Sequence, residues 1–158
     1  MAGKTYRQMV AEAVGRIAEI APWDLPDRLA ADPSPILVDI REPAEFSAAH
    51  IAGSINVPRG ILESAVEWDY AETEPDLAST RERPVILVCR SGNRSALAAL
   101  VLAEMGYGDV ASVRLGVKGW NDADLPLVDG DGRPVDGDEA MARLEPPLPP
   151  EKRAPKPA

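Results

Sequence analysis

The chain has 158 residues, of which 45% are hydrophobic, so it fits one domain of ordinary size and is too apolar to be globally disordered. A net charge of −9 argues against nucleic acid and anionic membranes as partners, and no apolar run approaches the roughly 18 residues of a membrane span. The single cysteine excludes a disulfide within the chain and favours a reducing compartment, so we expect a cytoplasmic protein.

Residues 1–22 are expected to form an amphipathic helix and a lead-in to the main domain. Thr5 and Gln8 have the spacing of a capping box, in which each side chain satisfies a backbone amide at the start of a helix. Apolar residues follow at helical spacing, namely Tyr6, Met9, Val10, Ala13, Val14 and Ile17. Such a stripe favours packing on the domain's own core, and a docking or dimerisation face is the alternative.

Between residues 23 and 128, short apolar segments alternate with helical patterns. Strands are expected at 36–40, 54–57, 85–88 and 110–115, and helices at 24–31, from 43, at 61–68 and at 96–105. The strands at 36–40 and 85–88 are apolar without alternation, as in a parallel sheet that is covered on both faces. The alternation of strands and helices predicts an α/β fold with a mostly parallel sheet.

The composition changes from about residue 129. Seven of the 16 prolines lie in the last 25 residues, between positions 134 and 157. We therefore expect residues 129–158 to form a turn built on an Asp-Gly pair, followed by a Pro-rich flexible tail.

The strongest functional signal is the segment that connects the strand at 85–88 to the next helix. It reads Cys89-Arg90-Ser91-Gly92-Asn93-Arg94-Ser95. A strand, a tight loop and a helix start place the sulfur among backbone amides at the positive end of a helix dipole, which favours a nucleophilic thiolate. The two arginines supply forked donors for an oxyanion, and the glycine permits a backbone conformation that side chains oppose. An inert buried thiol beside surface charges is the structural alternative.

The loop has no evident general base close to it in the sequence. The only histidine, His50, lies about forty residues upstream of the cysteine. The chemistry should therefore need little proton transfer at the site, as in sulfur exchange.

Four stretches follow one another along the chain at 36–46, 50–58, the loop 89–95 and 106–120. In these stretches, which together cover about residues 23–128, the chain resembles the single-domain rhodaneses, a sulfurtransferase family, and the loop resembles the active-site loop of that family closely. There are three departures from the family pattern. Ala49 replaces a Gly, Ser54 replaces an Ala, and Gly116-Val117 stands where a Gly-Gly pair is usual.

This resemblance implies a three-layer α/β sandwich, with a mostly parallel five-stranded sheet and helices on both faces. It implies that Cys89 takes the outer sulfur of a small anionic donor such as thiosulfate, and that a thiol or cyanide acceptor discharges the persulfide. Substrate binding falls to the loop residues Arg90, Ser91, Gly92, Asn93, Arg94 and Ser95. Structural roles near the site fall to Asp39, Arg41 and His50. Neither a metal nor an organic cofactor is expected, because no ligand cluster and no nucleotide loop is present.

Two other interpretations remain. The chain could be a sulfur-relay or regulatory module that works with a protein donor or acceptor. It could also be a phosphatase or arsenate reductase, which resemble rhodaneses but place five residues between the cysteine and the arginine. Four residues separate Cys89 from Arg94, and a shorter ring is cramped for a tetrahedral oxyanion. The oligomeric state is not predicted.

Overall fold

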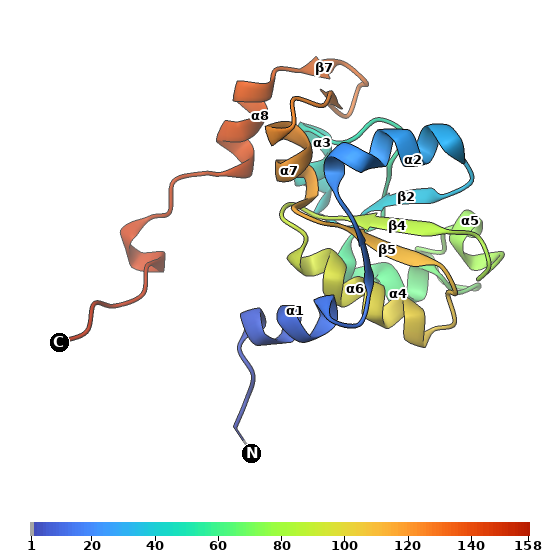
Figure 1. Ribbon diagram of the computed structural model, residues 1–158, viewed down its shortest axis with the longest axis horizontal. Coiled ribbons are helices and arrows are strands. Elements are labelled where there is room, and N and C mark those ends of the chain that lie inside the picture. Colours follow the sequence, from blue (N-terminus) through green and yellow to red (C-terminus); the bar gives the residue numbers. More distant parts are fainter. Residues whose placement is uncertain (1) are drawn as a thin grey trace.

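A five-stranded sheet, in which every neighbouring pair is parallel, forms the centre of the computed structural model, which describes residues 2–158 (Figure 1). The strand order is β1-β5-β4-β2-β3. The strands are β1 (Ala18–Ile20), β2 (Ile36–Asp39), β3 (Ile55–Asn56), β4 (Val85–Val88) and β5 (Val110–Val113). Helices connect the successive strands, as parallel pairing requires, and the expected α/β architecture is confirmed.

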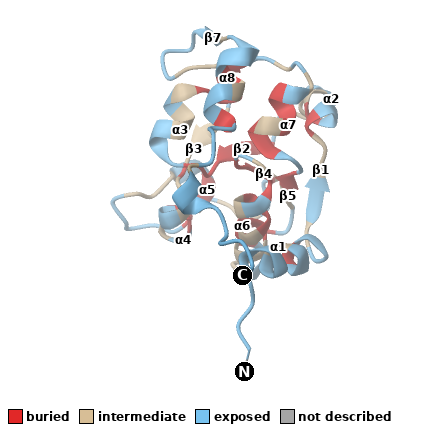
Figure 2. Ribbon diagram, turned by 90° about the vertical axis from the view of Figure 1, so that its left-hand side faces the viewer, coloured by how far each residue is buried: buried red, intermediate tan, exposed pale blue. Residues whose placement is uncertain are grey.

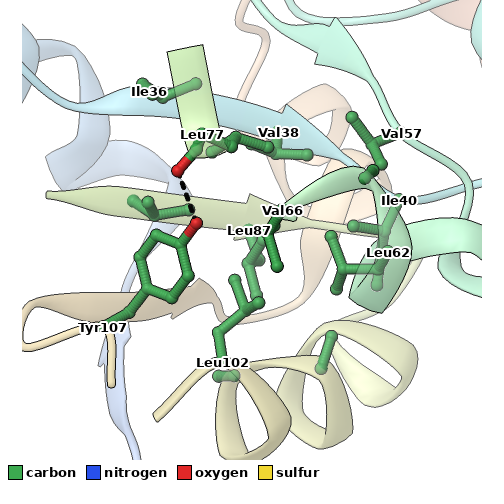
Figure 3. Close-up of a cluster of buried hydrophobic side chains, with 14 of the residues drawn as sticks. Ile36, Val38, Ile40, Val57, Leu62, Val66, Leu77, Leu87, Leu102 and Tyr107 are labelled. Atoms are coloured by element: carbon green, nitrogen blue, oxygen red, sulfur yellow. Dashed lines mark hydrogen bonds between the residues drawn. The ribbon is translucent and has the colours of Figure 1, made fainter. Parts of the chain in front are cut away.

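One face of the sheet is covered by α4 (Leu62–Ala65), α5 (Pro75–Ala78) and α6 (Asn93–Glu104). Side chains of β2 and β4 that point to this face, such as Val38 and Leu87, join the helices in one buried cluster (Figure 3). At its edge the Tyr107 hydroxyl donates a hydrogen bond of 2.6 Å to the Leu77 carbonyl oxygen. This face anchors α6, the helix that follows the cysteine loop.

The other face carries a second buried cluster and a second helical layer (Figure 2). Its elements are η1 (Pro22–Asp24), α2 (Leu25–Ala31), α3 (Pro43–Ala48), α7 (Gly116–Asp122) and α8 (Gly137–Leu144). Leu37, Ile86 and Val88 point to this side, whereas their neighbours in the chain point to the first cluster. Burial on both faces explains why β2 and β4 are apolar without alternation.

The first helix, α1 (Tyr6–Val14), packs on α6 rather than on the sheet. The capping box is present: the Gln8 amide donates to Thr5 Oγ1 at 3.1 Å, and the Thr5 amide donates to Gln8 Oε1 at 2.8 Å. Ala13 is buried, but Tyr6 and Met9 stay about half exposed, at 53% and 46%. The apolar stripe is therefore only partly covered within this chain.

Several elements were not expected from the sequence. β1 forms an edge of the main sheet within the lead-in at 1–22, where it pairs with β5. β6 (Leu127–Val128), at the end of the expected domain, and β7 (Pro134–Val135) form an antiparallel hairpin, and α8 follows in the region expected to be a flexible tail. Ala140 and Leu144 of α8 are buried in the second cluster, so the folded part extends to about residue 144.

The remaining elements are short helical turns, η2 (Arg59–Ile61) before α4 and η3 (Pro150–Lys152) near the C-terminus. Residues 153–158 are exposed. Among the helices over residues 2–158, none combines the length and the apolar character that crossing a membrane requires.

Candidate active site

Cys89 follows the last residue of β4, and its sulfur lies at the start of α6. The amides of Gly92 and Ser95 donate to Cys89 Sγ at 3.2 and 3.4 Å, and Ser95 Oγ lies 3.4 Å from the same sulfur. The cysteine is buried, and the positive end of the α6 dipole adds to the field of the two amides. These contacts favour negative charge on the sulfur.

The Ser95 hydroxyl that faces this sulfur has a hydrogen-bond partner of its own. Ser112 of β5 is fully buried, and its Oγ lies 2.7 Å from Ser95 Oγ. The two hydroxyls and Cys89 Sγ thus form a hydrogen-bonded chain that reaches from the neighbouring strand to the thiol. Ser112 is not predictable from the sequence, because nothing in a strand of this composition marks one serine as facing a residue 17 positions away.

The loop is fixed from outside by the start of α7. The amides of Val117 and Lys118 donate to the carbonyl oxygens of Cys89 and Arg90 at 2.8 and 2.9 Å. This close approach requires Gly116, since a Cβ at that position would collide with both carbonyl groups. Two helix N-termini therefore meet at the loop, one directed at the sulfur and one at the loop carbonyls.

The turn before α7 has an unusual backbone conformation. Leu115 and Gly116 are the two successive residues in the left-handed region, with φ of 66° and 59°, whereas Val117 lies inside α7. Glycine adopts this region without strain and leucine does not. Leu115 therefore carries backbone strain that a glycine would not, and it is 48% exposed and borders Gly92 of the loop.

The two arginines of the loop have different surroundings. Arg94 is half-buried and donates to both carboxylate oxygens of Glu45, with distances of 2.9 and 3.0 Å. The hydrogen bond to Glu45 raises the pKa of Arg94, despite its burial, and the charge of Cys89 raises it further. Arg90 is exposed and forms no ion pair with residues 2–158. Arg90 is thus the loop cation that is free to meet an anion.

Asp39 and Arg41 form a buried ion pair at the carboxyl end of β2. The Arg41 guanidinium donates from Nη2 to Asp39 Oδ2 at 2.8 Å and to the Ala49 carbonyl oxygen at 2.6 Å. The Asn56 amide group donates to the carbonyl oxygens of Asp39 and Arg41. These contacts brace the turn that leads into α3, which carries Glu45.

His50 is not part of the hydrogen-bonded chain formed by Ser112, Ser95 and Cys89. Its Nδ1 donates to the Phe46 carbonyl oxygen at 2.8 Å, and its ring stacks on Phe46 with centroids 3.7 Å apart. Its backbone pairs with Val128 next to the β6–β7 hairpin. Over residues 2–158, no three His, Cys, Asp or Glu side chains gather closely enough to hold a metal ion.

Two other predicted loop residues are accessible to solvent. Ser91 is half-buried, and Asn93 is exposed as the first residue of α6. Partial burial raises the pKa of the Tyr6 hydroxyl on α1, the charge of Cys89 raises it further, and the charges of Arg94 and Arg90 lower it, so this hydroxyl lies within electrostatic reach of the loop. No sequence signal points to this proximity, since Tyr6 belongs to a helix far from the loop in the chain.

Comparison with known proteins places this geometry in a family. The family model described as "Rhodanese-like domain" matches residues 23–123. A protein named "Sulfurtransferase" from Allochromatium vinosum is 32% identical over 116 residues, which cover 73% of this chain and 99% of that protein. The "Thiosulfate:glutathione sulfurtransferase" of Saccharomyces cerevisiae is 34% identical over 92 residues, covering 56% of this chain and 66% of that one.

Solved structures agree with the family. A protein of unknown function from Rhodopseudomonas palustris, titled a possible tyrosine phosphatase, has a TM-score of 0.72 and 28% identity, with coverage of 80% of this chain and 96% of that one. A thiosulfate sulfurtransferase from Pseudomonas aeruginosa has a TM-score of 0.64 and 26% identity, over 84% of this chain and 25% of that one. The relatives support a sulfurtransferase-type activity. With its family match over residues 23–123 and its parallel five-stranded sheet, the chain belongs to the rhodanese-like domain family.

Proposed function

We propose that this protein is a sulfurtransferase that carries sulfane sulfur as a persulfide on Cys89. The observation that carries this proposal is the pair of amide hydrogen bonds from Gly92 and Ser95 to Cys89 Sγ at the start of α6. A thiolate held in this way is a nucleophile, and the same donors suit the negative charge of a persulfide.

The reaction has two half-reactions and should show ping-pong kinetics. The Cys89 thiolate attacks the outer sulfur of thiosulfate, the S–S bond of the donor breaks, and sulfite leaves with its electron pair. In the second half-reaction an acceptor thiolate or cyanide attacks the outer sulfur of the persulfide, and the Cys89 thiolate leaves. No oxidant, reductant or general base takes part, which suits a site whose histidine is engaged elsewhere.

The two arginines are proposed to have separate roles. Arg90, exposed and without an ion pair among residues 2–158, orients the anionic donor. Arg94 is held by Glu45 and contributes positive charge beside the sulfur rather than a donor group that moves to the substrate. Ser91 and Asn93 line the approach to the sulfur.

The names of the relatives support this assignment. The Allochromatium vinosum protein is named a sulfurtransferase, and the yeast protein is named for thiosulfate and glutathione. We propose the same substrate classes here, an anionic sulfur donor and a thiol acceptor. We also propose a cytoplasmic location, because the single cysteine must stay reduced to react.

The test is the intact mass of the purified protein before and after exposure to thiosulfate. A gain of about 32 Da, one sulfur atom, is expected, and cyanide should remove it. The Cys89→Ser variant should show no gain. If the unmodified protein gains no mass with thiosulfate, or if Cys89→Ser gains the same mass, the proposal is wrong.

A phosphatase is the second candidate, because the Rhodopseudomonas palustris structure is titled a possible tyrosine phosphatase. The ion pair between Arg94 and Glu45 disfavours a phosphatase activity, because a phosphatase needs the loop arginine to bind the phosphoryl group that is transferred. Hydrolysis of p-nitrophenyl phosphate that depends on Cys89, without a persulfide from thiosulfate, would reverse this ranking.

A further inference from the structure

A groove runs from the cysteine loop to the C-terminal segment. Its volume is about 730 Å³, within the range of sites that hold small organic ligands. One wall is formed by Arg90 and Ser91, the two residues that follow Cys89, together with Lys118 of α7. The opposite wall is formed by Leu144, the last residue of α8, and by residues 145–149 and Lys152 of the segment that leaves the body of the molecule after this helix (Figure 1).

The groove is positive in a protein whose net charge is −9. Arg90, Lys118 and Lys152 line it, and the only carboxylate among its lining residues is Glu145. Lys118 Nζ already contacts Glu145 at 3.2 Å and Asp122 at 2.9 Å. Arg90 and Lys152 form no ion pair within residues 2–158, so their charges are free for a ligand.

The groove also has an apolar side. Leu144, Leu148 and the prolines at 146, 147 and 149 contribute to it. The prolines at 146, 147 and 149 disfavour an α-helix between α8 and η3, because their rings fix φ and they lack an amide N–H. The far wall lies outside residues 23–123, which the family model matches, so it is a feature of this chain beyond the family domain.

We propose that this groove is the acceptor subsite, and that its ligand is a thiol with the bulk of a small peptide and at least two carboxylates. This inference rests on the proposed function. The carboxylates would meet Lys152 and Arg90, and the thiol would reach the loop beside Ser91. The acceptor thiolate then attacks the outer sulfur of the Cys89 persulfide, the sulfur–sulfur bond breaks, and the Cys89 thiolate is released with its electron pair.

The test compares two acceptors in the second half-reaction alone. The full-length protein is loaded with thiosulfate, freed of excess donor, and mixed with glutathione or with uncharged 2-mercaptoethanol. The measured quantity is the ratio of the second-order rate constants for persulfide discharge by the two thiols. Relative to the unmodified protein, this ratio should fall about threefold in Lys152→Gln and about tenfold in Lys152→Glu, since a near-surface charge has a modest effect that reversal enlarges. High salt should also lower it, because these charges are accessible to ions.

Lys156 offers a matched control. It is exposed in the same segment but does not line the groove, so Lys156→Gln and Lys156→Glu should leave the ratio unchanged. Equal ratios in the Lys152 and Lys156 variants would overturn the subsite, and so would a Lys152 effect of equal size on both thiols. The absence of any persulfide after loading would instead overturn the proposed function, so the two failures are distinguishable.

Discussion

Arg94 and Glu45 form a two-point ion pair across 49 positions of the chain, which joins α3 to the first turn of α6. The pair fixes the guanidinium of the loop arginine before any substrate arrives. Planar paired contacts of this kind are geometrically specific, so the arginine has one preferred orientation beside the sulfur. Replacement of Glu45 should therefore lower the free energy of unfolding and leave the Arg94 side chain without a fixed orientation.

The stabilising effect of Glu45 should depend on pH. Burial raises the pKa of its carboxyl, but hydrogen bonds from Arg94 and the Glu42 amide, together with nearby arginine charges, outweigh burial and lower it below the ordinary value of 4.5. A lowered pKa in the folded state gives stability that is present above the unfolded value and is lost as pH falls through the folded value. The advantage of the unmodified protein over Glu45→Gln in urea unfolding should therefore shrink from about pH 5 to about pH 3.

The exposed tail residue Glu151 provides the control for this series. Glu151→Gln should change the free energy of unfolding by less than about 0.5 kcal/mol at every pH. A constant difference between the unmodified protein and Glu45→Gln over the same pH range would contradict the assigned role of the ion pair.

Gly116→Ala should damage the site and the fold together. The added methyl group would collide with the carbonyl groups of Cys89 and Arg90, at a residue with φ of 59°. We expect a loss of about 2 kcal/mol or more in the free energy of unfolding and a loss of most of the persulfide formation. Gly60→Ala is the matched control, since a methyl group there meets nothing. Normal persulfide formation in Gly116→Ala would show that the contact between α7 and the loop is dispensable.

The left-handed conformation of Leu115 should lower the free energy of unfolding. Leu115→Gly and Leu115→Ala both remove the exposed side chain, but only glycine is free of strain at φ of 66°. Leu115→Gly should be more stable than Leu115→Ala by about 1 kcal/mol. In the helix α1 the order should reverse, with Met9→Ala more stable than Met9→Gly by about 1 kcal/mol. Thermal unfolding of the four variants tests which of Gly and Ala is the more stable at each position. If Ala is the more stable at both, Leu115 carries no backbone strain.

Ser112→Ala should make the Cys89 thiol less reactive, although Ser112 acts on the sulfur only through Ser95. Loss of the Ser112 hydroxyl leaves Ser95 without the partner that orients it towards Cys89 Sγ. The loss of one hydrogen bond of ordinary strength should slow alkylation by iodoacetamide about threefold at pH 7. The measured quantity is the second-order rate constant of alkylation at pH 7, compared between the variant and the unmodified protein.

A control separates this effect from loss of packing. Ser79→Ala, at an exposed helix end, should alkylate like the unmodified protein. An unchanged alkylation rate in Ser112→Ala would contradict the role of the Ser112–Ser95 hydrogen bond, and a drop that accompanies a loss of folded structure in circular dichroism would indicate lost packing instead.

The parts of the fold that were predictable are those in which local pattern and burial agree. The strands at 36–39 and 85–88 are buried on both faces, so their residues are almost uniformly apolar and easy to detect. β1 was missed because it is three residues long, has one neighbour and is largely exposed, which leaves little pattern to detect. α8 was missed because only Ala140 and Leu144 of its eight residues are buried, and prolines dominate the segment after it.

The site was predictable only as far as it is local. The loop 89–95 could be recognised from its own residues and from the strand and helix that flank it. The partners that tune it, Glu45 and Ser112, come from distant positions, and nothing in their own neighbourhoods signals the contact. The strain at Leu115 also needed the backbone angles, since the sequence does not reveal that this leucine adopts the left-handed conformation.

Because peptide groups are planar, the contact between α7 and the loop also fixes the direction of amide groups that α7 does not bind. In a trans peptide the carbonyl oxygen and the following N–H point in opposite directions. Because α7 binds the carbonyl oxygens of Cys89 and Arg90, it turns the N–H groups of Arg90 and Ser91 away from itself. A helix that never touches the sulfur thus sets the direction of two loop dipoles. A change in the first turn of α7 could therefore retune the cysteine while every residue of the loop stays the same.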